Sequence, residues 1–303
     1  MIDRKGVFSF LAITFGLTYL VEGLLIGAGF RVSDRPAIFG QLVVAGVMWA
    51  PALATVLTIK FVTREGFAIT NMRLGSWRPY LTTALVIPAT FALIYGLTWL
   101  WGLGHPDWHL THFQSQMASM GADMAQMPPA SQLLPLMLLA TLVFTPFING
   151  IFGFGEELGW RGYLLPKLMP LGKVKAYLLV GLAWGLWHAP LILVGFNYPG
   201  HPILGVIWMI GLMTTLGVYI SEMTLRHRSS ILAGWMHGVF NSQGYGIWRL
   251  LFPEASPLWG GMTGLLAMLV WLGLGIYEMR KGCLLYTSPS PRDLSTSRMP
   301  SSA

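Results

Sequence analysis

Residues 203–222 read ILGVIWMIGLMTTLGVYISE and carry no charged side chain before Glu222. A helix of about 20 apolar residues is long enough to cross the ~30 Å hydrocarbon core of a bilayer. We therefore predict an all-α, polytopic membrane protein with about eight transmembrane helices. The other seven apolar runs lie at about 7–30, 37–62, 80–103, 131–155, 174–195, 230–250 and 257–279.

The composition supports this class. Of the 303 residues, 54% are hydrophobic and 10% are charged, whereas soluble domains average about 45–50% and ~25%. The net charge of +7 comes from basic residues that occur singly between apolar runs. They form no stripe, so we expect a lipid bilayer and no nucleic acid as partner. The single cysteine excludes an intramolecular disulfide framework.

Basic residues also predict the orientation, because cytoplasmic loops are enriched in Lys and Arg. With eight spans and a cytoplasmic N-terminus, only Arg31, Arg35 and Arg249 face outside. We therefore expect an N-in/C-in topology. The basic residues placed inside are Arg4, Lys5, Lys60, Arg64, Arg73, Arg78, Arg161, Lys167, Lys173, Lys175, Arg226, Arg228, Arg280 and Lys281.

The C-terminal segment differs in character from the rest. From Cys283 the chain reads CLLYTSPSPRDLSTSRMPSSA, which is rich in Ser and Pro and has no apolar period. The string CLLYTSPSPRD resembles a translated sequencing adapter, and the alternative is a natural disordered tail. We divide the chain into N-terminal helices with an outer loop (1–130), a helical core (131–282) and a non-native tail (283–303).

Charged residues cluster in one apolar region, where residues 153–166 read GFGEELGWRGYLLP. In a helix, Glu157 and Arg161 are spaced i, i+4 and can form an ion pair. Glu156 is rotated by about 100° and can face a cavity between helices as a base. The alternative is a salt-bridged start of a cytoplasmic loop.

Two later spans add polar side chains at membrane depth. His188 lies in LAWGLWHAP, one turn after Trp184, and His237 and Asn241 lie i, i+4 in GWMHGVFNSQG. A lone intramembrane histidine is often only a hydrogen bond between helices. Together with Glu156, however, these groups supply a base, two imidazoles and an amide donor. Such a set can activate water and stabilise an oxyanion.

The loop 104–130 contains a second group of titratable residues. Three histidines and an aspartate could bind a metal ion, but we favour a solvated segment on the membrane surface. The residues are His105, His109, His112, Asp107 and Asp123.

The three motifs occur in the order found in a known family. Glu156-Glu157-xxx-Arg161, Trp184-xxx-His188 and His237-xxx-Asn241 resemble those of the CPBP intramembrane proteases. That family includes the Rce1-type CAAX prenyl endopeptidases and the Abi bacteriocin-immunity proteins. The motifs cover residues 156–241, and Trp184 departs from the pattern because phenylalanine is common at this position.

The resemblance implies a role for each position. Glu156 is expected to be the general base that activates water, with Glu157 and Arg161 as its electrostatic support. His188 and His237 would orient the water, and Asn241 would stabilise the oxyanion. A zinc ion held by Glu156, His188 and His237 is a further expectation, although no HExxH sequence is present.

The expected function is therefore an intramembrane endopeptidase in a prokaryotic plasma membrane. Its substrate would be a protein or peptide, C-terminal and prenylated in eukaryotic members of the family. Two alternatives remain: a non-catalytic scaffold or immunity-type protein of the same fold, and a transporter with a polar path to both faces. The transporter is disfavoured because the polar residues are expected in the cytoplasmic half, and spans one to three add only Glu22.

Overall fold

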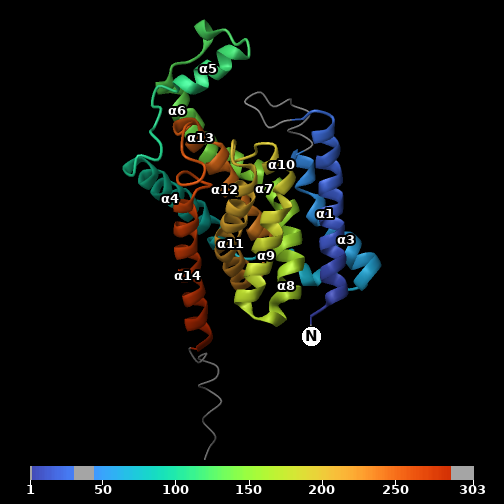
Figure 1. The fold of residues 1–303 in the computed structure, drawn as a ribbon. Helices are drawn as coiled ribbons and strands as arrows, with labels where there is room; N and C mark the ends of the chain where they lie inside the picture. The colour runs from blue at the N-terminus through green and yellow to red at the C-terminus, as the bar shows by residue number, and fades with distance from the viewer. Residues whose placement is uncertain (1, 31–43, 288–303) are drawn as a thin grey trace, which may run out of the picture.

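The computed structural model describes residues 2–30 and 44–287, with the backbone alone for 282–287. The regular elements within these residues are helices (Figure 1). The predicted all-α class is therefore confirmed. The predicted tail from Cys283 lies outside the described residues from 288 onward, and so do residues 37–43 of the second predicted span.

Within the described residues, five helical stretches are long and apolar enough to cross a membrane. Their outer faces expose large apolar side chains such as Phe147, Ile148 and Ile151, as contact with lipid requires. The chain is thus a multi-pass membrane protein. The five stretches are α1 (Arg4–Gly27), Val44–Thr63, α4 (Arg78–Leu100), Ala130–Leu171 and α11 (Pro202–His227).

The other three predicted spans are shorter or shifted in the structure. The fifth is divided at His188 into α9 (Lys173–Trp187) and α10 (Ala189–Leu193), where Pro190 starts the second helix. The seventh is divided at Gly246 into α12 (Ser230–Tyr245) and α13 (Ile247–Leu251). The last begins only at Leu265, as α14 (Leu265–Thr287). A count of eight spans therefore stays a prediction.

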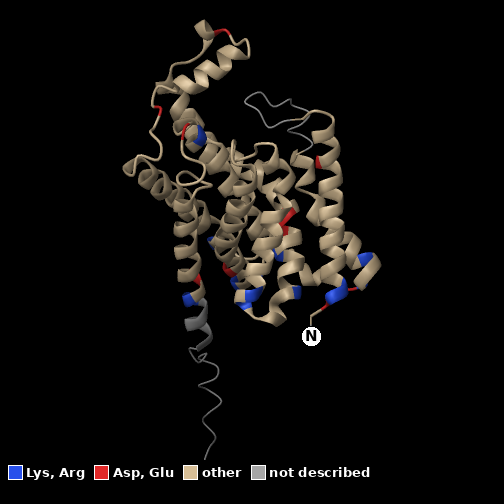
Figure 2. Cartoon of the chain, in the orientation of Figure 1, with Lys and Arg blue, Asp and Glu red and all other residues tan. Residues whose placement is uncertain are grey.

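Lys and Arg gather at the end of the bundle where the N-terminus lies, which we call the basic end (Figure 2). Helices α9 and α12 both begin near basic residues, at Lys173 and just after Arg228. Ser229 caps the start of α12, where its hydroxyl oxygen accepts a hydrogen bond from the Leu232 N–H at 3.0 Å. This distribution matches the pattern behind the predicted N-in topology, which stays a prediction.

The stretch Ala130–Leu171 changes helix type several times. The helix α7 (Thr145–Glu157) ends at the two glutamates and continues as a π-helical turn over Leu158–Leu164. Such π turns often occur at functional sites. The remaining elements are α3 (Ala50–Leu57), the π turns Thr58–Thr63 and Ala140–Phe144, the 3₁₀ turns Phe67–Thr70, Met124–Gln126 and Met169–Leu171, α5 (Thr111–Ser119), α6 (Ala130–Leu139) and α8 (Leu165–Leu168).

Glycines allow α7 and α12 to approach closely. A Cβ atom on Gly153 would lie 2.9 Å from Cβ of His237 and 3.0 Å from the carbonyl oxygen of Gly234. Small residues at such interfaces are typical of membrane helices because they let backbones pack together. This contact brings the glutamates at the end of α7 beside His237.

The segment that carries α5 rests on α13 at the end of the molecule opposite the basic end (Figure 1). The Asp107 N–H donates to the carbonyl oxygen of Leu251 at 2.7 Å, and the Ser256 N–H donates to that of Leu103 at 2.8 Å. Leu110 is fully buried and precedes α5. The contacts fix the segment to the helical core.

Candidate active site

Glu157 and Arg161 form the ion pair that their spacing predicts. Nη1 of Arg161 donates to both carboxylate oxygens of Glu157, at 2.8 and 2.9 Å. Both side chains are fully buried. This burial contradicts the alternative of a solvated loop start, because the pair lies inside the helical bundle.

The guanidinium of Arg161 lies between an aromatic ring and a glycine. Its Cζ atom is 4.1 Å from the centroid of the Trp184 ring, a cation–π distance. A Cβ atom on Gly217 of α11 would lie 3.1 Å from Nη2. The small residue on α11 thus makes room for a buried cation, while Nε and Nη2 of Arg161 find no hydrogen-bond partner among the residues that the structure describes.

Glu156 points away from Arg161, as its rotation around the helix predicts. Its Oε2 accepts a hydrogen bond from Nε1 of Trp184 at 2.7 Å. Its Oε1 lies 4.0 Å from Nε2 of His237. A phenylalanine in place of Trp184 could not donate to this carboxylate, so the departure from the family pattern adds a contact to the site.

The partners of the two histidines fix their tautomers. Nδ1 of His237 lies 3.0 Å from Oε1 of Glu157, and Nδ1 of His188 lies 2.8 Å from the carbonyl oxygen of Trp184. Both partners are acceptors, so each Nδ1 carries the proton and donates it. In a neutral imidazole, Nε2 is then an acceptor that is available to the site.

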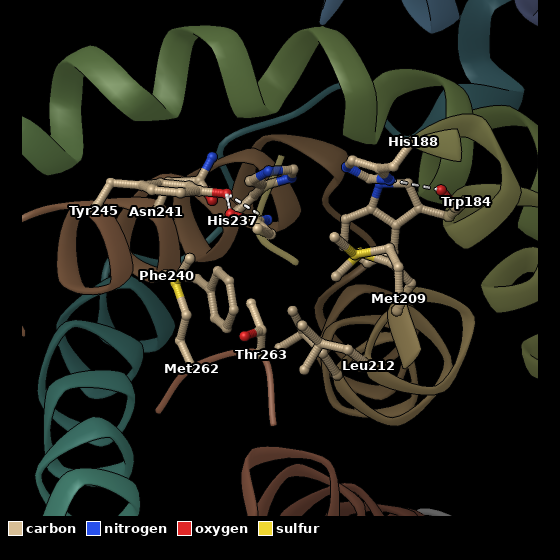
Figure 3. A pocket seen from close by; sticks show the side chains of 13 residues that line it. Trp184, His188, Met209, Leu212, His237, Phe240, Asn241, Tyr245, Met262 and Thr263 are labelled. Carbon is tan, nitrogen blue, oxygen red and sulfur yellow. Dashed lines mark hydrogen bonds between the residues drawn. The ribbon is translucent and has the colours of Figure 1, made fainter. Parts of the chain in front are cut away.

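A central cavity of about 30 Å³ lies beside these groups (Figure 3). This volume has room for about two water molecules. Glu156 does not line it and lies behind the wall that Trp184 and His237 form. The lining residues are Trp184, His188, Asn197, Met209, Leu212, Met213, Leu216, His237, Phe240, Asn241, Tyr245, Met262 and Thr263.

The central cavity lies away from the basic end. His188 follows the last residue of α9, which starts at Lys173 and has 15 residues, or about 22 Å at a rise of 1.5 Å per residue. Asn241 and Tyr245 likewise lie in the second half of α12. His188 and Asn241 therefore lie towards the end opposite the basic end. The placement of the polar residues in the cytoplasmic half stays a prediction, as does the orientation.

α1 adds a third carboxylate near the site. Glu22 is 1% exposed, and it is close enough to Glu156 for the two charges to interact. Within the described part of the chain, its Oε2 has no hydrogen-bond partner. Hydrogen bonds from Nε1 of Trp187 to Oγ1 of Thr18, at 2.7 Å, and from the Tyr19 hydroxyl to the Leu186 carbonyl, at 2.6 Å, hold α1 against the end of α9.

The expected metal site does not form among the described side chains. In residues 2–30 and 44–281 no three His, Cys, Asp or Glu side chains converge to hold a metal ion. This applies to Glu156, His188 and His237 and also to the histidines of loop 104–130. Two features do match metal ligands, since each imidazole donates Nδ1–H to an oxygen and leaves Nε2 open.

The structure brings together the six polar residues that sequence reasoning proposed, but that reasoning missed some of their neighbours. The indole of Trp184 bonds to Glu156, Gly217 accommodates Arg161, and Tyr245 borders the cavity with its hydroxyl bonded to Asn197. Tyr245 had a signal in the sequence, because it lies four residues after Asn241. Nothing local marked Gly217, since its role depends on the approach of α11.

The fold and this site together define a class: a multi-pass helical membrane protein with a buried carboxylate and imidazole centre. Comparison with protein families makes this more specific. Residues 131–243 match the family described as type II CAAX prenyl endopeptidase Rce1-like. This region contains all three motifs, so the part of the chain that holds the site is similar to the Rce1-like CAAX prenyl endopeptidases.

A relative with an assigned name supports this similarity. An 83-residue stretch is 40% identical to CAAX prenyl protease 2 of Methanococcus maripaludis. The aligned stretch covers 25% of this chain and 30% of the length of that relative. The aligned stretch thus spans less than a third of that relative.

Proposed function

We propose that this protein is an intramembrane endopeptidase in which Glu156 activates the attacking water. The observation that supports this most directly is the placement of Glu156. It is buried beside the small central cavity, and its Oε1 faces Nε2 of His237 across 4.0 Å. That separation is too long for a direct hydrogen bond and short enough for one water molecule to bond to both atoms.

The reaction follows from these positions. Glu156 takes a proton from the water molecule while the water oxygen attacks the carbonyl carbon of the scissile bond. The carboxamide of Asn241 donates to the oxyanion that forms. Collapse of this intermediate breaks the C–N bond, and the proton passes from Glu156 to the leaving amine.

The remaining charged groups keep this arrangement in place. Arg161 orients Glu157 through two hydrogen bonds. Glu157 in turn accepts a hydrogen bond from Nδ1–H of His237. This series of hydrogen bonds keeps Nε2 of His237 directed to Glu156. His188, with Nδ1 held by the Trp184 carbonyl, would present its own Nε2 to the water.

A zinc ion remains a separate proposal, and no step above depends on it. The described ligands do not converge on one point, so a metal site would require the side chains to move. Metal content of the purified protein, measured before and after chelation together with the cleavage rate, tests the dependence. Stoichiometric zinc whose removal abolishes cleavage would support a metalloprotease.

For the substrate class we propose a protein or peptide, and the name of the archaeal relative suggests a C-terminal, prenylated CAAX motif. The apolar surroundings of the site agree with a lipid-modified substrate that approaches through the bilayer. The location we propose is a prokaryotic plasma membrane.

The decisive experiment is cleavage of a peptide library by the purified chain in detergent. Glu156→Gln keeps the shape of the side chain but cannot take a proton, so the rate should fall ~10²–10⁴-fold. Asn241→Ala should lose ~10²–10³-fold if the amide is an oxyanion donor. The control is Asn149→Ala. It removes an amide that is hydrogen-bonded to Ser242, and Asn149 does not line the central cavity.

Two other functions predict different results. A scaffold or immunity-type protein predicts no cleavage by the parent protein and full complementation of a deletion by Glu156→Gln. A transporter predicts flux without cleavage. If a folded Glu156→Gln variant cleaves peptides as fast as the parent protein, Glu156 is not the base, even if the protein is a protease of this type.

A further inference from the structure

A second, larger cavity lies between α5 and α13, and we call it the distal cavity. Its volume is about 280 Å³. Tyr245 lines both the distal and the central cavity, so the two share a wall. The lining residues are His112, Phe113, Gln116, Tyr245, Arg249, Leu250 and Pro253.

Arg249 gives this cavity a positive charge that is not part of an ion pair among the described side chains. Its side chain is exposed, and among residues 2–30 and 44–281 no carboxylate lies within ion-pair distance of it. Asp107, which precedes α5, accepts the backbone N–H of His112 at 2.9 Å. Partial burial raises the pKa of Asp107, but the hydrogen bonds from the His112 N–H and from neighbouring backbone N–H groups outweigh this effect and hold the pKa below its usual value.

Polar side chains lead from the central cavity to Arg249. His237, Asn241 and Tyr245 follow one another at four-residue intervals, so they share one face of α12. Arg249 comes four residues later, on α13. Four residues of helical rise from Asn241 to Tyr245 correspond to about 6 Å, and α13 follows after the break at Gly246.

We propose that the distal cavity binds the C-terminal carboxylate of the substrate, with Arg249 as its ligand. This inference rests on the proposed endopeptidase function. A guanidinium can bind a carboxylate through two parallel hydrogen bonds. Tyr245, held by Asn197 through hydrogen bonds of 2.9 and 3.2 Å, separates this carboxylate from the reacting carbonyl group.

An anionic lipid headgroup offers similar chemistry, and the geometry favours the peptide. The distal cavity shares Tyr245 with the central cavity, and the polar stripe of α12 connects the two. A peptide cleaved in one cavity would place its end in the other. A lipid phosphate in the distal cavity would not need the connection to the central cavity.

Binding is measured first, so that the result does not depend on turnover. The full chain with Glu156→Gln is titrated against a labelled, farnesylated peptide that ends in a CAAX motif, as free acid or as amide, with fluorescence anisotropy as readout. The acid should bind about 10-fold more tightly than the amide. Arg249→Gln should remove this preference, and Arg249→Lys should keep part of it.

The matched control is Arg78→Gln, which removes an exposed arginine from the start of α4 and should leave the preference intact. In the chain with Glu156 present, Arg249→Gln should raise KM for the acid and leave kcat and the amide unchanged. Equal affinity of the Glu156→Gln chain with Arg249 intact for acid and amide would overturn the inference.

The same design separates the other outcomes. If no peptide is cleaved, the proposed function fails, and the anisotropy data still decide whether Arg249 recognises a carboxylate. Nanodiscs of phosphatidylglycerol and of phosphatidylcholine form the lipid arm. An effect of Arg249→Gln that appears only with phosphatidylglycerol, with acid and amide peptides bound alike, would assign the cavity to a lipid phosphate.

Discussion

Two ion clusters in this protein use similar residues in different surroundings. In the buried cluster, Arg161 binds Glu157, with His237 and Glu156 beside the pair, and both partners of the ion pair have no exposed side-chain surface. In the basal cluster, Lys167 binds Asp3 at 2.8 Å and Glu65 at 2.6 Å. The side chain of Asp3 there is 34% exposed, so water screens the interaction.

The difference separates two uses of charge. Desolvation of a buried ion pair costs about as much as its attraction returns, so stability alone does not explain Arg161 and Glu157. They hold His237 and leave Glu156 unpaired beside the cavity. The basal cluster joins the start of α1 to α8 and the loop after the Thr58–Thr63 turn, where a modest and screened attraction is sufficient.

The largest difference between the clusters should appear when each cation is removed. Arg161→Ala leaves a buried carboxylate uncompensated, at a cost of ~3–5 kcal/mol, whereas Lys167→Ala should cost ~0.2–1 kcal/mol. Thermal unfolding of both variants in the same detergent measures this. Equal losses would mean that the inner pair is hydrated in the real protein.

Glu157→Gln should cost less than Arg161→Ala, because the amide oxygen still accepts a hydrogen bond from Arg161. The same thermal measurement compares the two variants. A larger loss for Glu157→Gln would show that the guanidinium, and not the carboxylate, is the charge that most needs its partner.

The next prediction tests whether helix approach sets the geometry of the buried cluster. Gly153→Ala places a Cβ atom against His237 and Gly234, so α7 and α12 must separate, at ~1–3 kcal/mol, and cleavage should fall with it. Gly150→Ala is the control, since its Cβ would meet only the Gly234 carbonyl oxygen, at 3.9 Å. Similar behaviour of the two variants would mean that this interface is not tightly packed.

The buried cluster was more predictable from sequence than its surroundings. The spacing of Glu157 and Arg161 is local, so helix geometry alone predicted the pair and the separate direction of Glu156. The apolar runs likewise predicted the helical class. The break at His188 and the indole bond from Trp184 to Glu156 depend on how distant helices meet, which residue spacing does not encode.

The same limit explains the missed break in the fifth span and the missed distal cavity. Counting from span boundaries treated the fifth span as one helix, whereas it ends at His188 and turns there. The distal cavity joins α5 with α13, and the residues that line it belong to no common motif. A buried polar group leaves a mark in an apolar sequence, but a cavity between surface segments does not.

The smallest predicted effect belongs to the basal cluster and depends on pH. The hydrogen bond from Lys167, aided by the Gly6 N–H, lowers the pKa of Asp3. A carboxyl whose pKa is lower in the folded state stabilises the protein above its unfolded pKa of about 3.9, and this contribution is lost as the pH falls through the folded pKa. Asp3→Asn should therefore cost ~0.2–1 kcal/mol at pH 7 and progressively less below pH ~4.

Thermal unfolding of the parent protein and Asp3→Asn between pH 7 and pH 3 measures this difference directly. Asparagine still caps α1 by accepting the Gly6 N–H, which Asp3 accepts at 2.9 Å, so the substitution removes mainly the charge that faces Lys167. Added salt should reduce the difference at pH 7, because the pair is partly exposed. A difference that persists unchanged at pH 3 would show that the charge of Asp3 is not its source, and the contrast between the buried and the basal cluster would then lose its electrostatic basis.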